Sequence, residues 1–524
     1  MHSLLLALAL IAPQGPSEKD LFDDLLTAVR AGQAADGSYG SGLRDTADAV
    51  IAFALSPRAY RVDDGPFFRD AVTWLLRHQA EAQGEDEEAR LALALVRAHA
   101  SLYLPSVQDI LDRHGWQAQN LPQQVLTGVT AASALELLLA IPPDASASAR
   151  IRAVAQAAVL RSVAVKKAAS RPDASASYER GVDALLALRG SSGFWEVFEM
   201  PEPGISAIAA RALLGSQRES VRAAAAPVLD WLVSLQQDDG SIHAGHVQVY
   251  TTSAAIGALL AAKRPQDQPV IARAVAFLIA TQCDEGEGYS ESDKFYGGIG
   301  YGGDLRPDLS NLQYALEALH QAGVAADDPS FVRAMKFLQR SQNHSESNTE
   351  VYLDADDPRP IRAGNDGGAA YYPGNSPAGV ETLADGGRVA RSYGSMTYAL
   401  LKCYAFAGLD AQDPRVAAAV GWISSHWTLE INPGFDMLKD ARAGFQGLYY
   451  YYETLAEALA ALKLDEVVAP GGARHDWRTE LIVTLQATQR EDGSWVNEFA
   501  PRWWEGNPAL CTGYALNALL AARP

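Results

Sequence analysis

Carboxylic acids and aromatic side chains come together in loops that precede apolar helices in the C-terminal half of this 524-residue chain. Asp308 stands at the start of one such helix, and Glu453 ends a run of four tyrosines. A carboxyl group that burial keeps neutral can act as a proton donor. We therefore take Asp308 and Glu453 as the candidate catalytic residues.

The aromatic residues of the same loops predict the lining of a cavity. Rings that face a cavity attract a cation, and so would suit a carbocation. They suit an apolar ligand or a stacked sugar equally well, and a plug of aromatic side chains without a ligand is the plain alternative. The predicted cavity or substrate-binding residues are Asn311, Tyr372, Tyr393, Ser395, Tyr450, Trp504 and Thr512.

Each candidate acid also has a simpler role. Asp308 stands where a helix N-cap is expected, since aspartate accepts hydrogen bonds from the amides of the first helical turn. Glu453 could pair with a base or with solvent. A third alternative is the pair of facing carboxylates of a carbohydrate-active enzyme, which needs two acids at a set separation. The acids that could supply such a pair are Asp308, Asp366, Glu453 and Glu505.

The sequence predicts no metal and no cofactor. His243 and His246 flank one turn without a third ligand, so we expect them to be solvated. The three cysteines show no metal spacing, and at most one disulfide can form between them.

Composition excludes some partners. The net charge is −20, the pI is about 4.9, and no run of Lys and Arg suggests a nucleic-acid surface. An acidic surface also disfavours electrostatic docking on anionic lipids. With 48% hydrophobic residues a large core can form. The aromatic loops make an apolar small molecule a possible ligand. No protein partner is indicated.

The N-terminus resembles an export signal. Residues 4–11 are apolar, which is too short to span a bilayer but suits a signal peptide over residues 1–16. Against this, no Lys or Arg precedes the apolar run. We expect a periplasmic or secreted protein, and a cytoplasmic one if these residues are not a signal.

Helical hairpins repeat along the chain. An apolar helix ends at Gln236, a turn of type Asp-Asp-Gly-Ser follows, and a second apolar helix begins near Thr251. The same pattern surrounds Gln33 and Gln489. The glutamine can bond the next backbone segment, and Asp-Gly permits a tight turn. Gln282 follows Gln236 by 46 residues (282 − 236), a period typical of stacked helical hairpins.

The second helix is the more apolar of each pair, and residues 251–262 and 510–522 carry almost no charge. A helix that is apolar all round is buried. We therefore predict an all-α fold with two concentric helix layers that close a ring, an α/α toroid. The predicted domain covers residues 17–524, with weak repeats over 89–190 and a long loop insertion over 343–391.

The segment from Gln489 to Trp495, Gln-Arg-Glu-Asp-Gly-Ser-Trp, resembles the repeat of squalene and oxidosqualene cyclases, which protein prenyltransferase β-subunits share. The resemblance implies the toroid fold. It also implies an isomerase-type activity, the acid-initiated cyclisation of squalene or another isoprenoid.

The motifs that do chemistry in these families are altered here. Bacterial squalene cyclases carry Asp-x-Asp-Asp at the start of an inner helix. Asp354, Asp356 and Asp357 match it, but Pro358 and Pro360 bar a helix there, so an acidic solvated loop is expected. The prenyltransferase zinc set is incomplete, because Asn311 stands where its histidine would be.

Three interpretations remain open: a terpene-cyclase-like enzyme, an exported toroid that binds a ligand or partner without catalysis, and a carbohydrate-active enzyme. The resemblance favours the first. Export argues against it, since isoprenoid cyclases usually meet their substrates from the cytosolic side.

Overall fold

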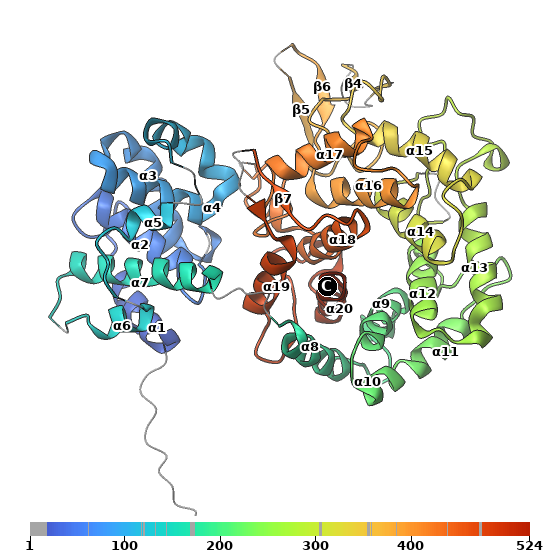
Figure 1. Cartoon of the computed structure of the whole chain (residues 1–524), viewed down its shortest axis with the longest axis horizontal. Helices are drawn as coiled ribbons and strands as arrows, with labels where there is room; N and C mark the ends of the chain where they lie inside the picture. The colour runs from blue at the N-terminus through green and yellow to red at the C-terminus, as the bar shows by residue number, and fades with distance from the viewer. Residues whose placement is uncertain are drawn as a thin grey trace, which may run out of the picture. The chain divides into compact units, whose positions relative to one another are not determined.

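The computed structural model describes residues 18–523 except 61, 117, 119–120, 132, 143, 168–172, 303–305, 354–356, 358, 384, 438 and 471–473. The predicted helical class is confirmed, because most of these residues lie in α-helices (Figure 1). The predicted signal peptide, residues 1–16, lies outside the described residues. One repeat domain was expected from residue 17 onward, but contacts group the chain into two compact units, residues 1–170 and 171–524.

The N-terminal unit packs helix α2 between α4 and α7. Leu91, Leu93 and Val154 are among the fully buried residues of its core. Its one clear repeat turn follows α1, where the side-chain amide of Gln33 donates to the carbonyl oxygens of Gly37 and Phe67. The helices are α1 (Glu18–Ala31), α2 (Leu43–Leu55), α3 (Pro66–His78), α4 (Gly84–His114), α5 (Leu121–Val125), α6 (Ala134–Leu139) and α7 (Ala147–Lys167).

The C-terminal unit has an inner layer of helices that are buried on nearly every side, as expected from their apolar character, although several carry a buried charged residue. Each inner helix packs against the next in chain order, and α20 packs against α9 (Figure 1). These helices are α9 (Pro203–Leu214), α12 (Gln248–Ala262), α14 (Leu309–Gln321), α16 (Gly394–Phe406), α18 (Leu448–Ala461) and α20 (Pro508–Ala521).

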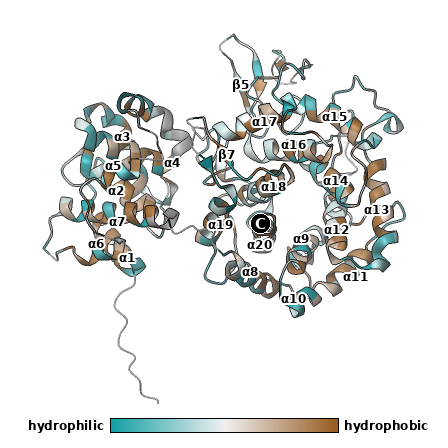
Figure 2. Ribbon diagram, viewed as in Figure 1, coloured by the Kyte–Doolittle hydropathy of each residue, from teal (hydrophilic) through white to brown (hydrophobic). Residues whose placement is uncertain are grey.

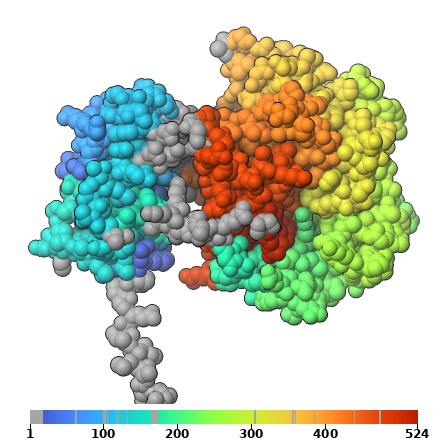
Figure 3. All heavy atoms as spheres, in the orientation of Figure 1, coloured from blue at the N-terminus to red at the C-terminus, as the bar shows by residue number. Residues whose placement is uncertain are grey.

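The outer helices of this unit carry both hydrophobic and hydrophilic residues (Figure 2). Several begin with proline, whose fixed φ suits the first helical turn. They are α8 (Ser175–Ala187), α10 (Glu219–Ala223), α11 (Ala226–Ser234), α13 (Gln268–Ala280), α15 (Pro329–Ser341), α17 (Pro414–Ser425) and α19 (Trp477–Thr488). In the space-filling view, the C-terminal segments, orange to red, are seen toward the middle of this unit (Figure 3).

The repeated glutamines join successive outer helices. The side-chain amide of Gln236 donates to the carbonyl of Gly240 in its own turn and to that of Val270 in α13. Gln282 reaches Ser330 in α15 in the same way. Gln342 likewise reaches Arg415 in α17. The glutamine therefore holds its turn and the next outer helix together.

A second set of bonds joins each turn to the inner helix that follows. The amide of Trp495 donates to the hydroxyl of Thr512 at 3.0 Å, as that of Ile242 does to Thr252 at 2.9 Å. Thr512 was predicted to line the cavity, but the structure places its hydroxyl at this junction, where it bonds the turn, and not in the cavity wall.

The insertion over residues 343–391 contains a small sheet rather than loop alone. Its strand order is β3-β4-β6-β5, with β4 and β6 parallel and the other neighbours antiparallel. The strands are β3 (Val351–Tyr352), β4 (Ile361–Arg362), β5 (Val380–Thr382) and β6 (Arg388–Ala390). Two further strand pairs are β1 (Glu196–Val197) with β2 (Met200–Pro201), and β7 (Val467–Val468) with β8 (Arg474–His475).

In the described part of the chain, none of the helices has the length and apolar character needed to cross a membrane.

Candidate active site

A cavity of about 690 Å³ opens at the N-terminal ends of the inner helices. Its size falls in the usual range for small-molecule sites. Each inner helix presents a residue from its first turn to this cavity, since side chains at the same helical position face the same way. These residues are Ile205, Tyr250, Ser310, Ser395, Tyr450 and Leu510.

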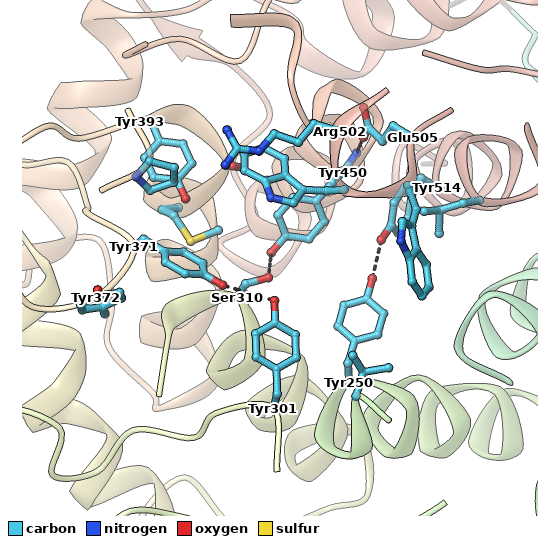
Figure 4. Close-up of a pocket in the computed structure, with 18 of the residues that line it drawn as sticks. Tyr250, Tyr301, Ser310, Tyr371, Tyr372, Tyr393, Tyr450, Arg502, Glu505 and Tyr514 are labelled. Carbon is cyan, nitrogen blue, oxygen red and sulfur yellow. Dashed lines mark hydrogen bonds between the residues drawn. The ribbon is translucent and has the colours of Figure 1, made fainter. Parts of the chain in front are cut away.

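Aromatic rings dominate the cavity wall (Figure 4). The structure brings most of the predicted cavity residues here, namely Tyr372, Tyr393, Ser395, Tyr450 and Trp504. Asn311 lies outside the wall, beside Asp308. The aromatic residues of the lining are Tyr250, Tyr301, Tyr371, Tyr372, Tyr393, Tyr450, Tyr514, Trp503 and Trp504.

Hydrogen bonds fix the directions of several rings. The hydroxyls of Ser310 and Tyr450 are 3.0 Å apart, and that of Tyr250 bonds to that of Tyr514 (Figure 4). The phenolic groups are thereby held by one another, which leaves the ring faces available to an apolar ligand.

Three non-glycine residues of the wall have left-handed backbone conformations. Val247 has φ 43°, Trp503 has φ 55° and Trp504 has φ 66°. Such conformations cost about 1–3 kcal/mol each and gather at functional sites. Val247 is the most unusual of the three, because a β-branched residue rarely adopts this region.

Glu505 is a buried acid of the cavity wall whose two carboxyl oxygens are both engaged. Oε2 accepts from the amide of Leu448 at 2.8 Å and Oε1 from that of Tyr450 at 2.9 Å, at the start of α18. Asn497 donates a further bond over 2.6 Å. Burial raises the pKa of Glu505 to about 7, against the lowering effect of these donors. The geometry is that of a carboxylate that caps a helix.

Glu202 is a second buried acid of the wall, and sequence reasoning missed it. Its side chain caps α9, where Oε2 accepts from the amide of Ile205 at 2.5 Å. Oε1 has no hydrogen-bond partner among the described residues. Burial raises the pKa of this carboxyl, which is 4% exposed. The sequence signal is an acid just before an inner helix, the position that Asp308 occupies before α14.

His246 lies near that unbonded oxygen. Its Nε2 lies 3.8 Å from Glu202 Oε1, and its side chain is 54% exposed. A water-accessible imidazole therefore stands beside an acid that is itself buried.

Asp308 lies behind the wall rather than in it. The fully buried carboxylate caps α14, where Oδ1 accepts from the amide of Asn311 at 2.8 Å and Oδ2 from its side chain at 2.9 Å. Burial raises the pKa of Asp308 to about 6, against these bonds. The structure thus gives Asp308 the N-cap role that was its simpler alternative.

Glu453 lies one helical turn below the cavity, on α18. Its carboxyl accepts from the hydroxyl of Tyr314 at 3.1 Å and from the amide of Asn517 at 2.9 Å. Burial, together with the nearby carboxylate of Glu457, raises the pKa of Glu453 to about 8.

A buried ion network lies one turn deeper again. Lys402 Nζ is 2.8 Å from both Glu317 Oε2 and Glu457 Oε2. Arg211 is 3.3 Å from Glu317 and 3.1 Å from Glu457. Two cations thus share two carboxylates, which balances their charge.

Two further predicted acids, Asp357 and Asp366, do not line the cavity. Asp354 and Asp356 lie outside the described residues. Asp357 pairs with Arg359 at 2.7 Å and with Arg388 at 3.5 Å, and the bond from Arg359 holds its pKa far below the usual range. Asp366 accepts from the hydroxyl of Ser392 at 2.9 Å, beside the inserted sheet.

Within the described residues no cluster of three or more His, Cys, Asp or Glu side chains could hold a metal ion. His243 and His246 flank their turn, and the backbone amide of Gly245 donates to His243 Nδ1. None of the cysteines forms a disulfide, and all three are buried.

Residues 202–359 match the family described as squalene-hopene cyclase C-terminal domain. The resemblance predicted from the glutamine repeats is confirmed over this segment, which is less than half of the chain. No curated protein matches the sequence.

Solved structures similar to this chain include terpene cyclases. One is a variant of the type II terpene cyclase MstE from Scytonema in complex with geranylgeranyl dihydroxybenzoate. It is 14% identical, and the match covers 67% of this chain and 97% of that chain with a TM-score of 0.41. Another is ent-copalyl diphosphate synthase from Streptomyces platensis, with 15% identity, coverage of 61% and 87%, and a TM-score of 0.23. Sequence identities and TM-scores this low do not identify an activity.

Proposed function

We propose that the C-terminal unit is an α/α toroid whose cavity binds an isoprenoid chain and cyclises it after protonating one of its double bonds. The observation that carries the proposal is Glu202, a buried acid of the aromatic wall with one carboxyl oxygen that no described residue bonds. Protonation of an alkene needs a carboxyl that is neutral before the reaction, and burial favours the neutral form.

The two oxygens of Glu202 suit different parts of this step. Oε2 is held by the amide of Ile205, so the proton belongs on Oε1. Transfer from Oε1 converts the π electron pair of the alkene into a new C–H bond and leaves a cation on the neighbouring carbon. The carboxylate that results faces the N-terminus of α9, whose amides and dipole stabilise negative charge.

The wall suits the cation that this step creates. Each ring presents a negative face, and an attraction of about 0.5–2 kcal/mol per ring is usual for a cation held over it. A series of aromatic side chains along the cavity can stabilise the positive charge as it moves along the substrate while the rings of the product form. The hydroxyl groups bond to one another, so they compete less for the cation than free ones would.

His246 can supply the proton that restores the neutral form of Glu202 after turnover. After turnover Glu202 needs a proton from solvent, and the exposed imidazole 3.8 Å from Oε1 can carry one to it. The acid can therefore be recharged although it is itself buried.

The other interpretations have less support. A filled centre would favour a toroid without a ligand, whereas this one holds a cavity. The carbohydrate interpretation needs two facing acids. The wall holds two acids, Glu202 and Glu505, but both oxygens of Glu505 are occupied, so Glu505 is not free to act as the second acid. Export stays a prediction.

The test is incubation of the purified chain with squalene, linear isoprenoid alcohols and prenyl diphosphates, with products identified by mass spectrometry. Cyclic isomers of a substrate are expected from the wild type. Glu202→Gln should lower their formation by at least about 10²-fold, the scale of a lost general acid. The matched control is Glu196→Gln, a carboxylate six residues earlier that bonds Ser192 outside the cavity. No cyclic product from any substrate would contradict the proposal.

A further inference from the structure

A row of hydroxyl groups leads from the cavity to Glu453. Tyr250, on α12, lines the cavity and donates to the hydroxyl of Tyr314, on α14, over 3.2 Å. Tyr314 in turn donates to Glu453 Oε2, on α18, over 3.1 Å. Three inner helices thus contribute one continuous chain of hydrogen bonds from a wall residue (Tyr250 in Figure 4) to a buried carboxyl group.

The surroundings decide which charge Glu453 can carry. Arg211 and Lys402 are each shared by Glu317 and Glu457, so these four charges balance without Glu453. A negative charge on Glu453 is an additional one, and it is opposed by Glu457 and by burial and favoured by the two cations. The groups around it are Arg211 from α9, Tyr250 from α12, Tyr314 and Glu317 from α14, Lys402 from α16, Tyr450 and Glu457 from α18, and Tyr514 and Asn517 from α20.

We infer that Glu453, reached through Tyr314 and Tyr250, is the base that ends the reaction by taking the proton that the final carbocation loses. The inference rests on the proposed function and adds the terminating group to it. A C–H bond next to the cationic carbon breaks, and its electron pair becomes the double bond of the product. The proton passes to the oxygen of Tyr250, the proton of Tyr250 to Tyr314, and that of Tyr314 to Oε2 of Glu453.

The hydrogen-bond directions agree with this role. Both oxygens of Glu453 accept bonds, from Tyr314 and from Asn517, so the site is arranged around the carboxylate form. A base is most effective when its pKa lies near the working pH, and that of Glu453 is about 8. The same value makes Glu453 a poor choice for the initial acid, which has to protonate a carbon atom.

The test compares Glu453→Gln, Tyr314→Phe and Tyr250→Phe with the wild type on whichever isoprenoid the wild type converts. Glutamine preserves the packing, since its carbonyl can accept from Asn517 while its amide donates to Tyr314. Each variant should still consume substrate, but the main alkene should fall by about 10²-fold. Products of water addition or of other deprotonations should replace it. The control is Tyr352→Phe, which removes a buried hydroxyl of the inserted sheet that has no hydrogen-bond partner among the described residues.

The pH profile gives a second readout. The carboxylate fraction of Glu453 grows as pH rises toward 8, so formation of the alkene by the wild type should rise over this range. Glu453→Gln should lack that rise. An unchanged product set and an unchanged profile in Glu453→Gln would overturn the relay and leave the cyclase function standing.

An infrared pH titration needs no turnover. The wild type should show a carboxyl band that forms with a midpoint near pH 8, is absent in Glu453→Gln and shifts in Tyr314→Phe. A wild type that shows this band but converts no isoprenoid would overturn the proposed function, and the catalytic role of the relay with it. Absence of the band would overturn the relay alone.

Discussion

The side-chain amide of Gln489 donates to the backbone carbonyl of Ser177 over 2.9 Å, across 312 residues of sequence. The bond joins α19, the last outer helix, to α8, the first. The hydroxyl of Ser177 returns a bond to Gln489 Oε1 at 2.7 Å. The glutamine that links consecutive hairpins elsewhere therefore links the two ends of the C-terminal unit.

Removal of this link should destabilise the unit. Gln489→Ala leaves the carbonyls of Ser177 and Gly493 without their donor, at a cost of about 1–3 kcal/mol. The free energy of unfolding in urea measures it. Gln237→Ala is the control, since the side chain of Gln237 is exposed and bonds locally to Leu235. Equal loss in the two variants would contradict a closing role for Gln489.

The ion network below Glu453 should be sensitive to loss of its central cation. Lys402→Met leaves two buried carboxylates with only Arg211 to share, and breaking a buried pair in this way costs about 3–5 kcal/mol. Thermal unfolding measures the loss. Lys294→Met, at an exposed lysine, is the comparison. A melting temperature for Lys402→Met as high as that of Lys294→Met would show that the network does not stabilise the fold.

Stability should fall as pH rises from about 5 to 8. The folded pKa of Glu453, about 8, exceeds its ordinary value of 4.5, so the folded state holds a proton that the unfolded state loses in this window. Stability from this group is full below pH 4.5 and is lost as pH rises through 8. Glu505, with a pKa of about 7, acts in the same direction.

Urea unfolding at several pH values between 5 and 8.5 measures this dependence. Glu453→Gln should flatten it, because the amide does not titrate, whereas Glu196→Gln should leave it as in the wild type. An identical slope in Glu453→Gln and wild type would mean that Glu453 has an ordinary pKa in the folded protein.

Local patterns predicted the repeat and its bonds, but not which repeats pack together. The turn after Gln33 has the same bonds as the turn after Gln236, yet the two belong to different compact units. Hydrogen bonds within a hairpin depend on nearby residues, whereas the division at residue 170 depends on contacts between distant helices.

The candidate site was predictable where composition is unusual. The aromatic loops indicated the cavity, and Tyr372, Tyr393 and Tyr450 line it. The sequence did not predict which residues of a helix reach the cavity. Tyr450 lines it, whereas Glu453, only one turn further along the same helix, lies below it. Glu202 has no aromatic run beside it, and only its burial and its unbonded oxygen distinguish it from an ordinary N-cap.

The acidic motif of the insertion should not take part in catalysis. Asp357 is partly exposed, and the bond from Arg359 lowers its pKa and keeps it ionised, which is the opposite of a neutral buried acid. Asp357→Asn should therefore form product at the wild-type rate. The rate of product formation, measured by mass spectrometry, checks this. A loss comparable to that of Glu202→Gln would show that Asp357 takes part in catalysis.

Deuterium transfer from solvent tests the role of Glu202 most directly. In D₂O the initiating proton comes from an exchanged carboxyl group, so each cyclic product molecule should carry one deuterium at the carbon that Glu202 protonates. Glu202→Gln should form the deuterated cyclic product at least about 10²-fold more slowly than the wild type, while Glu196→Gln should match the wild type. Formation of deuterated product by Glu202→Gln at the wild-type rate would show that another acid starts the reaction and would contradict the account.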